Sequence, residues 1–165
     1  SIGNDGLARI WDHATGRELQ VLDRHVGRLW TGDFSADGAT LATAGDDLVV
    51  RLWDVATGRH LHTLPGHSRR VISVAFSPTE PLLASAGDDG TIILWDLSTT
   101  EPTRKVTLLG LPGGWAAFAP DGRYKQDGNV HGEFWFAIAM CRFDPGELDP
   151  YLTNVIRRLA TQAEF

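Results

Sequence analysis

The chain has 165 residues and a formal net charge of -6, with 15 lysines and arginines against 21 aspartates and glutamates. A mildly acidic chain argues against nucleic-acid binding, which favours a basic face, and no apolar run is long enough to cross a membrane. The single cysteine, Cys141, cannot form an internal disulfide bond, which suits a reducing compartment such as the cytoplasm. No glycine-rich phosphate loop is present, so we expect no cofactor.

One ten-residue pattern occurs three times, at residues 3–12, 45–54 and 87–96, and ends each time in Trp-Asp. The Trp-Asp pairs begin at positions 11, 53 and 95, a constant spacing of 42 residues. Each copy begins with Asp, Asn and Gly residues that favour a turn, and continues with the β-branched, aliphatic and aromatic residues of a strand. The nearly continuous apolar run predicts a strand that is covered on both faces.

Further short strands are expected at regular spacing, separated by turn residues, which predicts an all-β fold. In chain order the expected strands are residues 7–11, 18–22, 29–34, 40–44, 49–53, 60–64, 71–76, 82–86, 91–95, 104–108, 114–119, 122–126 and 133–143. After a turn-rich segment, the spacing of Leu152, Val155, Ile156 and Leu159 is helical, so the C-terminus is expected to be a short helix or an extended tail.

The repeat period and the terminal Trp-Asp resemble those of WD-repeat proteins, whose four-stranded blades form β-propellers. The resemblance implies a partial β-propeller of four-stranded antiparallel blades, about three to three and a half in number at this length. The expected units are residues 1–22 (the end of a truncated blade whose upstream part is missing), 23–64 and 65–108 (two WD-repeat blades), 109–145 (a degenerate terminal blade) and 146–165 (a tail).

The resemblance also implies a hydrogen-bonded tetrad in each blade, made of His, Ser or Thr, Asp and Trp. The matching residues are His25, Thr43, Asp47 and Trp53 in one blade, His67, Ser85, Asp89 and Trp95 in the next, and Ser1, Asp5 and Trp11 in the first copy. These groups can satisfy one another, because indole only donates, carboxylate only accepts, and hydroxyl and imidazole do both. We expect the tetrads to be structural.

Other chemistry was weighed for the same residues. A Ser/His/Asp set could form a hydrolase triad, but catalytic sets do not recur in successive repeats. The Asp pairs could bind metal, although turn chemistry explains them better. His60 and His62 lie two apart on an expected strand and could contribute to a zinc site, but a structural site needs about four ligands. We therefore expect no enzyme activity and no metal.

In WD-repeat proteins, residues just before the inner strand and just before the tetrad Asp often form a partner-binding face. The corresponding residues are Arg28, Arg69, Arg70, Asn4, Asp46 and Asp88. Arginine is favoured at interface hot spots, but a solvated rim would have the same composition. Trp30, one residue into its strand, is expected to pack between blades.

Residues 110–160 resemble the C-terminal end of large bacterial, often actinobacterial, multidomain WD-repeat proteins, through motifs such as Phe134-Trp135-Phe136 and Asp144-Pro145-Gly146. The resemblance implies a non-enzymatic protein–protein interaction scaffold or sensor segment of a larger bacterial signalling or defence protein. One alternative is a partial propeller that closes a ring as a homo-oligomer through unpaired blade edges. A hydrolase using the Ser/His/Asp set is another alternative.

Overall fold

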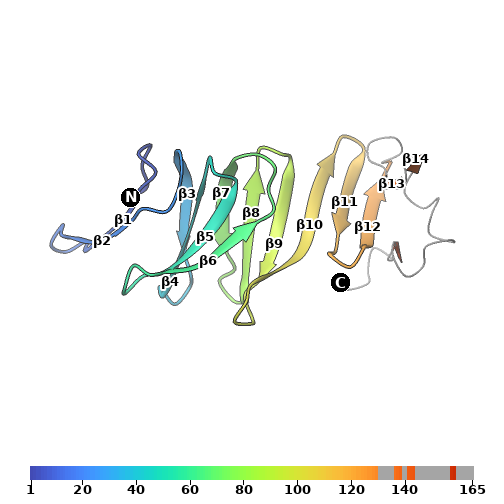
Figure 1. Cartoon of the computed structure of the whole chain (residues 1–165). Coiled ribbons are helices and arrows are strands. Elements are labelled where there is room, and N and C mark those ends of the chain that lie inside the picture. The colour runs from blue at the N-terminus through green and yellow to red at the C-terminus, as the bar shows by residue number, and fades with distance from the viewer. Residues whose placement is uncertain (130–135, 139–140, 144–156, 159–165) are drawn as a thin grey trace. The chain divides into compact units, whose positions relative to one another are not determined.

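The computed structural model describes residues 1–129, 136–138, 141–143 and 157–158, and all the regular structure in these residues is β-strand (Figure 1). The chain divides into two compact units, Ser1–Thr103 and Arg104–Phe165. None of the described residues form a helix that is long and apolar enough to cross a membrane. The prediction of an all-β fold is confirmed.

The first unit repeats one antiparallel meander. β1 (Ala8–Trp11) pairs with β2 (Glu18–Leu22), and the next four strands form one sheet in the order β3-β4-β5-β6. Within that sheet the strands are β3 (Leu29–Phe34), β4 (Thr40–Gly45), β5 (Val49–Asp54) and β6 (His60–Pro65). β7 (Val71–Phe76), β8 (Leu82–Gly87) and β9 (Thr91–Asp96) repeat the order of β3, β4 and β5. The predicted four-stranded antiparallel blade is therefore present.

Successive repeats bury their apolar faces against one another. One core cluster joins the sheet β3–β6 to strands β7–β9, and a second joins β1 and β2 to that sheet. Trp95 lies in the first cluster and Trp53 in the second, each with no more than 3% of its surface exposed. Two hydrogen bonds also connect β3 with β7, from Val74 N to Thr31 Oγ1 at 3.2 Å and from Phe76 N to Asp33 Oδ2 at 2.8 Å. Contacts with its neighbour therefore contribute to the stability of each repeat.

A β-bulge occurs at the same place in both inner strands. Leu29 pairs with Gly45 and Thr31 with Ala44, so Trp30 is the extra residue, and Ile72 is its counterpart in β7. Trp30 is 42% exposed. The expectation that Trp30 packs between blades is therefore wrong, because the bulge breaks the alternation of side chains and turns this residue outward.

The second unit contains β10 (Thr103–Leu111), β11 (Gly114–Phe118) and β12 (Arg123–Gly128), which pair in that order as antiparallel neighbours. β10 contains the strand expected at 104–108 and continues across the predicted boundary between 108 and 109. Phe118 and Tyr124 stack with ring centroids 6.4 Å apart.

The end of the chain differs from expectation. A single strand over residues 133–143 is wrong, because β13 (Phe136–Ile138) and β14 (Cys141–Phe143) form an antiparallel hairpin. β15 (Arg157–Arg158) pairs in parallel with β12, so these two residues of the stretch with helical spacing are extended. The rest of that stretch lies outside the described residues.

Substitution of Gly45 tests whether the bulge depends on the close approach of the backbone at Gly45 to the backbone at Arg28. A Cβ at Gly45 would overlap the carbonyl oxygen of Arg28, so we expect Gly45→Ala to lower the free energy of unfolding by about 1–3 kcal/mol. The control is Gly110→Ala, because Gly110 has ordinary backbone geometry and open space around it. Urea unfolding of both variants measures the difference, and equal stability of the two would contradict this account of the bulge.

Candidate functional site

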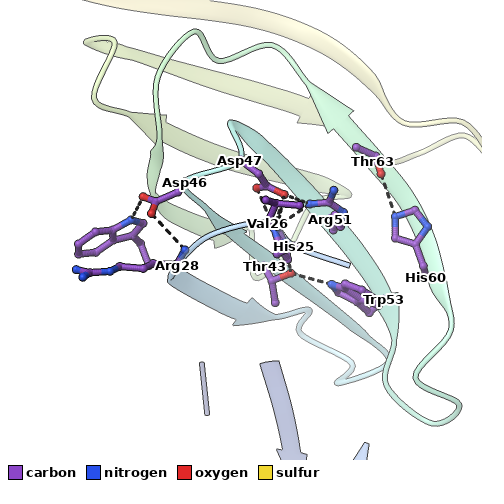
Figure 2. Close-up of polar contacts among 11 residues, drawn as sticks. His25, Val26, Arg28, Thr43, Asp46, Asp47, Arg51, Trp53, His60 and Thr63 are labelled. Carbon is purple, nitrogen blue, oxygen red and sulfur yellow. Dashed lines mark hydrogen bonds and ion pairs between the residues drawn. The ribbon is translucent and has the colours of Figure 1, made fainter. Parts of the chain in front are cut away.

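The structure brings His25, Thr43, Asp47 and Trp53 together (Figure 2). The indole N–H of Trp53 donates to Thr43 Oγ1 at 2.7 Å, and Thr43 Oγ1 lies 2.8 Å from His25 Nε2. His25 Nδ1 lies 2.9 Å from Asp47 Oδ1. The four side chains come from the segment before β3, from β4, from the β4–β5 turn and from β5, so the contacts hold these parts of one repeat together.

The next repeat has the same chain of contacts with Ser85 in place of Thr43. Trp95 Nε1 donates to Ser85 Oγ at 2.9 Å, Ser85 Oγ lies 2.9 Å from His67 Nε2, and His67 Nδ1 lies 3.0 Å from Asp89 Oδ2. The indole can only donate and the carboxylate can only accept. Every group in this series of contacts is therefore satisfied when the imidazole donates from Nδ1 and accepts at Nε2. The buried polar side chains of the two tetrads therefore have hydrogen-bond partners.

A basic residue that the sequence analysis missed supports the acid in the first of these tetrads. Arg51 forms an ion pair with Asp47 and lies 2.8 Å from His25 Nδ1. Burial would raise the pKa of Asp47, but hydrogen bonds from His25 and Arg51 outweigh it and hold that pKa below its usual range. Burial lowers the pKa of His25, although the hydrogen bond with Asp47 acts in the opposite direction.

The signal for Arg51 was present in the repeat. Arg9 lies 42 residues earlier and pairs with Asp5 at 2.8 Å, so an arginine follows the tetrad Asp by four positions in both copies. In the first copy Trp11 Nε1 also donates to Ser1 Oγ, at 3.0 Å.

In the third copy Ile93 takes the arginine's position, and a threonine supports the acid. Thr91 Oγ1 donates to Asp89 Oδ1 at 2.7 Å, and the backbone N–H of Ser68 donates to Asp89 Oδ2 at 2.8 Å. Burial would raise the pKa of Asp89, but these hydrogen bonds and the contact with His67 lower it to about 2. The carboxylate is therefore retained in acid solution without a neighbouring arginine.

The Ser/His/Asp order resembles a hydrolase triad, but its surroundings differ. Ser85 is 1% exposed, and its Oγ already accepts a hydrogen bond from Trp95. A nucleophile must reach a substrate carbonyl beside an oxyanion hole, and this oxygen lies between packed strands. The geometry favours a structural role for the set.

His60 and His62 have separate partners. His60 Nε2 lies 3.0 Å from Thr63 Oγ1, and its ring meets Trp53 edge-on at 5.3 Å. His62 Nδ1 lies 3.7 Å from Glu101 Oε2. Within the described residues, no group of three or more His, Cys, Asp or Glu side chains is arranged to hold a metal ion.

Five of the residues around the bulge form a connected surface, which we call the Trp30 face: Arg28, Trp30, Asp46, Arg70 and Asp88. Asp46 accepts from the Trp30 indole at 2.6 Å and from the backbone N–H of Arg28 at 3.2 Å (Figure 2). The Arg70 guanidinium lies 5.1 Å from the centroid of the Trp30 ring and pairs with Asp88. The hydrogen bond from Trp30 lowers the pKa of Asp46 most, followed by that from Arg28.

The other two residues of the predicted partner face are also placed. Arg69 is exposed, and within the described residues it makes no side-chain hydrogen bond or ion pair. Asn4 is exposed in the turn next to β3, where Leu29 N donates to Gly3 O at 3.2 Å. The structure therefore joins Arg28, Asp46, Arg70 and Asp88 through contacts and places Arg69 and Asn4 beside the same strand ends.

Apolar side chains are exposed at the same strand ends. Val26 is 77% exposed, and Ile72 is exposed beside Arg70. Leu48 is 38% exposed in the turn that holds Asp46, with φ of 69°. Its counterparts in the other copies are Gly6 and Gly90, which have φ of 78° and 79°. Leucine therefore occupies a left-handed conformation that glycine adopts without strain.

Comparison with known proteins identifies the repeat. Residues 16–54 and 58–96 match the family model described as WD domain, G-beta repeat, and these matches support a WD-repeat family. The comparison with curated proteins gave no match.

The solved structures that are similar to the chain include two with WD-repeat folds. One, described as "Crystal structure of RRP9 WD40 repeats", matches with a TM-score of 0.59 and 21% identity over 71% of this chain and 43% of that chain. The other, "Structure of U3-55K", matches with a TM-score of 0.58 and 22% identity over 72% of this chain and 44% of that chain. The chain thus spans less than half the length of each, and the similarity shows the fold.

The lowered pKa of Asp89 predicts that the free energy of unfolding depends on pH. Since its folded pKa is about 2 and its ordinary value is 3.8, its contribution is complete above about pH 4 and is lost as the pH falls towards 2. The full contribution is about 2 kcal/mol, and about half of it is lost by pH 3.

We therefore expect the stability difference between the wild type and Asp89→Asn to narrow between pH 6 and pH 3, as measured by urea unfolding. Asp23→Asn, at an exposed residue, is the control for loss of one negative charge. A difference that stays constant over this range would show that the carboxylate is not stabilised as described.

Proposed function

Because the chain carries two matches to the WD-repeat model, we propose that it is a non-enzymatic protein–protein interaction scaffold that binds a partner through the Trp30 face. The observation that supports this most is the exposed indole of Trp30. It donates a hydrogen bond to Asp46, and the Arg70 guanidinium lies over part of its ring. The setting in a bacterial signalling or defence protein is supported by the resemblance of residues 110–160 to the C-terminal end of large bacterial multidomain WD-repeat proteins.

The Trp30 face is organised before a partner arrives. The indole N–H is hydrogen-bonded to Asp46, and the guanidinium of Arg70 is placed between the Trp30 ring and Asp88. Binding would therefore immobilise few side chains, which lowers the entropic cost of association. Tryptophan and arginine are also the residues most enriched among interface hot spots.

The charges of this face suggest the chemistry of the partner. Asp88 pairs with Arg70, and Asp46 accepts from two neutral N–H groups and lies near the charge of Arg28, whereas the side chain of Arg69, beside the face, makes no hydrogen bond or ion pair to any part of the chain that the structure describes. Counting Arg69, three arginines stand against two aspartates at these strand ends, an excess of positive charge on a chain whose net charge is -6. Such a surface would attract an acidic segment of a partner.

Leu48 supports a binding role for the same turn. A left-handed leucine costs about 1–2 kcal/mol relative to an unstrained backbone, and glycine occupies the same place in two other copies. The leucine adds an exposed apolar side chain next to Asp46. Strain that is retained together with an exposed apolar group is typical of functional surfaces.

The proposal is tested by comparing proteins captured from cells that produce this chain. Tagged wild type, Trp30→Ala and Arg69→Glu are used as bait, and captured proteins are quantified by mass spectrometry. We expect at least one protein to fall several-fold with both variants. The control is Arg59→Glu, because Arg59 is exposed at the other end of the strands. If every captured protein is retained by both variants, the Trp30 face is a solvated rim.

Leu48→Gly separates binding from stability. We expect its free energy of unfolding to be equal to that of the wild type or higher by up to about 1 kcal/mol, because relief of strain outweighs the added freedom of the unfolded chain. Capture of the same partner should nevertheless fall. Gly90→Ala, which meets no atom within 4 Å, measures the backbone strain alone at the equivalent position. A stabilised Leu48→Gly variant with full capture would remove Leu48 from the binding surface.

A further inference from the structure

A concave site lies at the opposite ends of the same strands, away from the Trp30 face. Its volume is about 430 Å³, within the range typical of small-ligand pockets. Three turns line it, at residues 35–40, 77–82 and 97–102, together with β6. The first turn joins β3 to β4 and the second joins β7 to β8, so two successive repeats contribute to one cavity.

The interior of this cavity is apolar. Leu52 is buried at the centre of the sheet β3–β6, and Leu61, Phe76 and Leu97 pack against the core cluster and face the cavity with their remaining surface. Because these side chains are anchored in the core, the apolar surface is already formed without a ligand. An apolar group that entered would displace water from it.

The rim of the cavity is acidic. Asp37 and Glu80 line it, and none of the described residues that line it is a lysine or an arginine. Asp37 Oδ1 accepts from Ser35 Oγ at 2.6 Å and from Ala39 N at 3.0 Å. Its Oδ2 makes no hydrogen bond to another described residue and remains available to a ligand.

The other titratable side chains near the cavity do not change the negative charge of its rim. His62, which also lines it, has Nδ1 3.7 Å from Glu101 Oε2, and Glu101 adds a further carboxylate nearby. The hydrogen bond from Ser35 is the largest cause that lowers the pKa of Asp37, so that side chain is ionised at neutral pH. A positively charged group at the rim would thus meet carboxylates on two of the three turns.

We propose that this cavity binds a ligand with an apolar body and a positively charged amine or guanidinium. The apolar part occupies the space between Leu61, Phe76 and Leu97, and the cation contacts Asp37 and Glu80. The site is separate from the Trp30 face and is built from the other ends of the strands. It therefore provides this segment with a second binding activity.

The test uses two probes that share one ring and differ in charge. Phenethylamine is a cation at pH 7, and 3-phenylpropionate is an anion. Each is titrated into the isotopically labelled 165-residue chain, and amide and methyl shifts are followed by NMR. We expect saturable shifts at Asp37, Leu61 and Thr79 with the amine, at dissociation constants in roughly the millimolar range for so few atoms. Equal shifts with both probes, or none with either, would overturn the proposal.

Charge-neutral variants identify the rim carboxylates. Asp37→Asn combined with Glu80→Gln should weaken amine binding by at least about threefold, because two nearby charges are lost. The matched control is Asp12→Asn combined with Glu18→Gln. Asp12 accepts backbone hydrogen bonds from Ala14 and Thr15 in the β1–β2 turn, outside the cavity. The same loss of affinity in the control pair would show that only the net charge matters, and would overturn the assignment.

A peptide pair distinguishes two sources of the ligand chemistry. The blocked tetrapeptide Gly-Phe-Lys-Gly is compared with Gly-Phe-Glu-Gly in the same titration. Tighter binding of the lysine peptide than of phenethylamine supports a protein segment as the natural occupant, and the reverse order supports a small amine. Preference for the glutamate peptide would contradict the proposal in either form.

Discussion

Burial of one tryptophan between successive repeats is the constraint on which the rest of the structure depends. An indole buries a large apolar surface but carries an N–H that must find an acceptor. Trp53 and Trp95 meet this requirement through the hydroxyls of Thr43 and Ser85. Each hydroxyl then needs the histidine, and the histidine needs the carboxylate. The four residue types are therefore kept together by one packing requirement, and the resemblance to a hydrolase follows from their hydrogen-bonding chemistry.

Much of this was predictable from residue spacing. Strands β1 to β9 and the residues of each tetrad recur every 42 positions, so their positions follow once one copy is understood. The support of Asp47 by Arg51 and of Asp89 by Thr91 was not predicted, because the two copies solve the same electrostatic problem with different residues at different positions. A repeat pattern contains only the residues that the copies share, so it does not include residues such as these, which differ between copies.

Two features required three-dimensional information. Trp30 was expected to pack between blades, but a bulge that leaves no mark in hydrophobic periodicity turns it outward. The cavity is formed by turns that are about 20 to 60 residues apart in the chain, and no single turn indicates it. The strand expected over residues 133–143 was also divided into β13 and β14, because an apolar run alone does not show where a strand reverses.

The recurring bulge separates the residue that shapes the surface from the residue that packs in the core. At the second residue of each inner strand, one repeat has tryptophan and the next has isoleucine, while the neighbouring Leu29 and Val71 remain in the core. A substitution at the bulge changes the surface without changing what the repeat packs against. Each such repeat thus has one exposed position at which tryptophan and isoleucine are both accommodated, while the core residue before it keeps the same role.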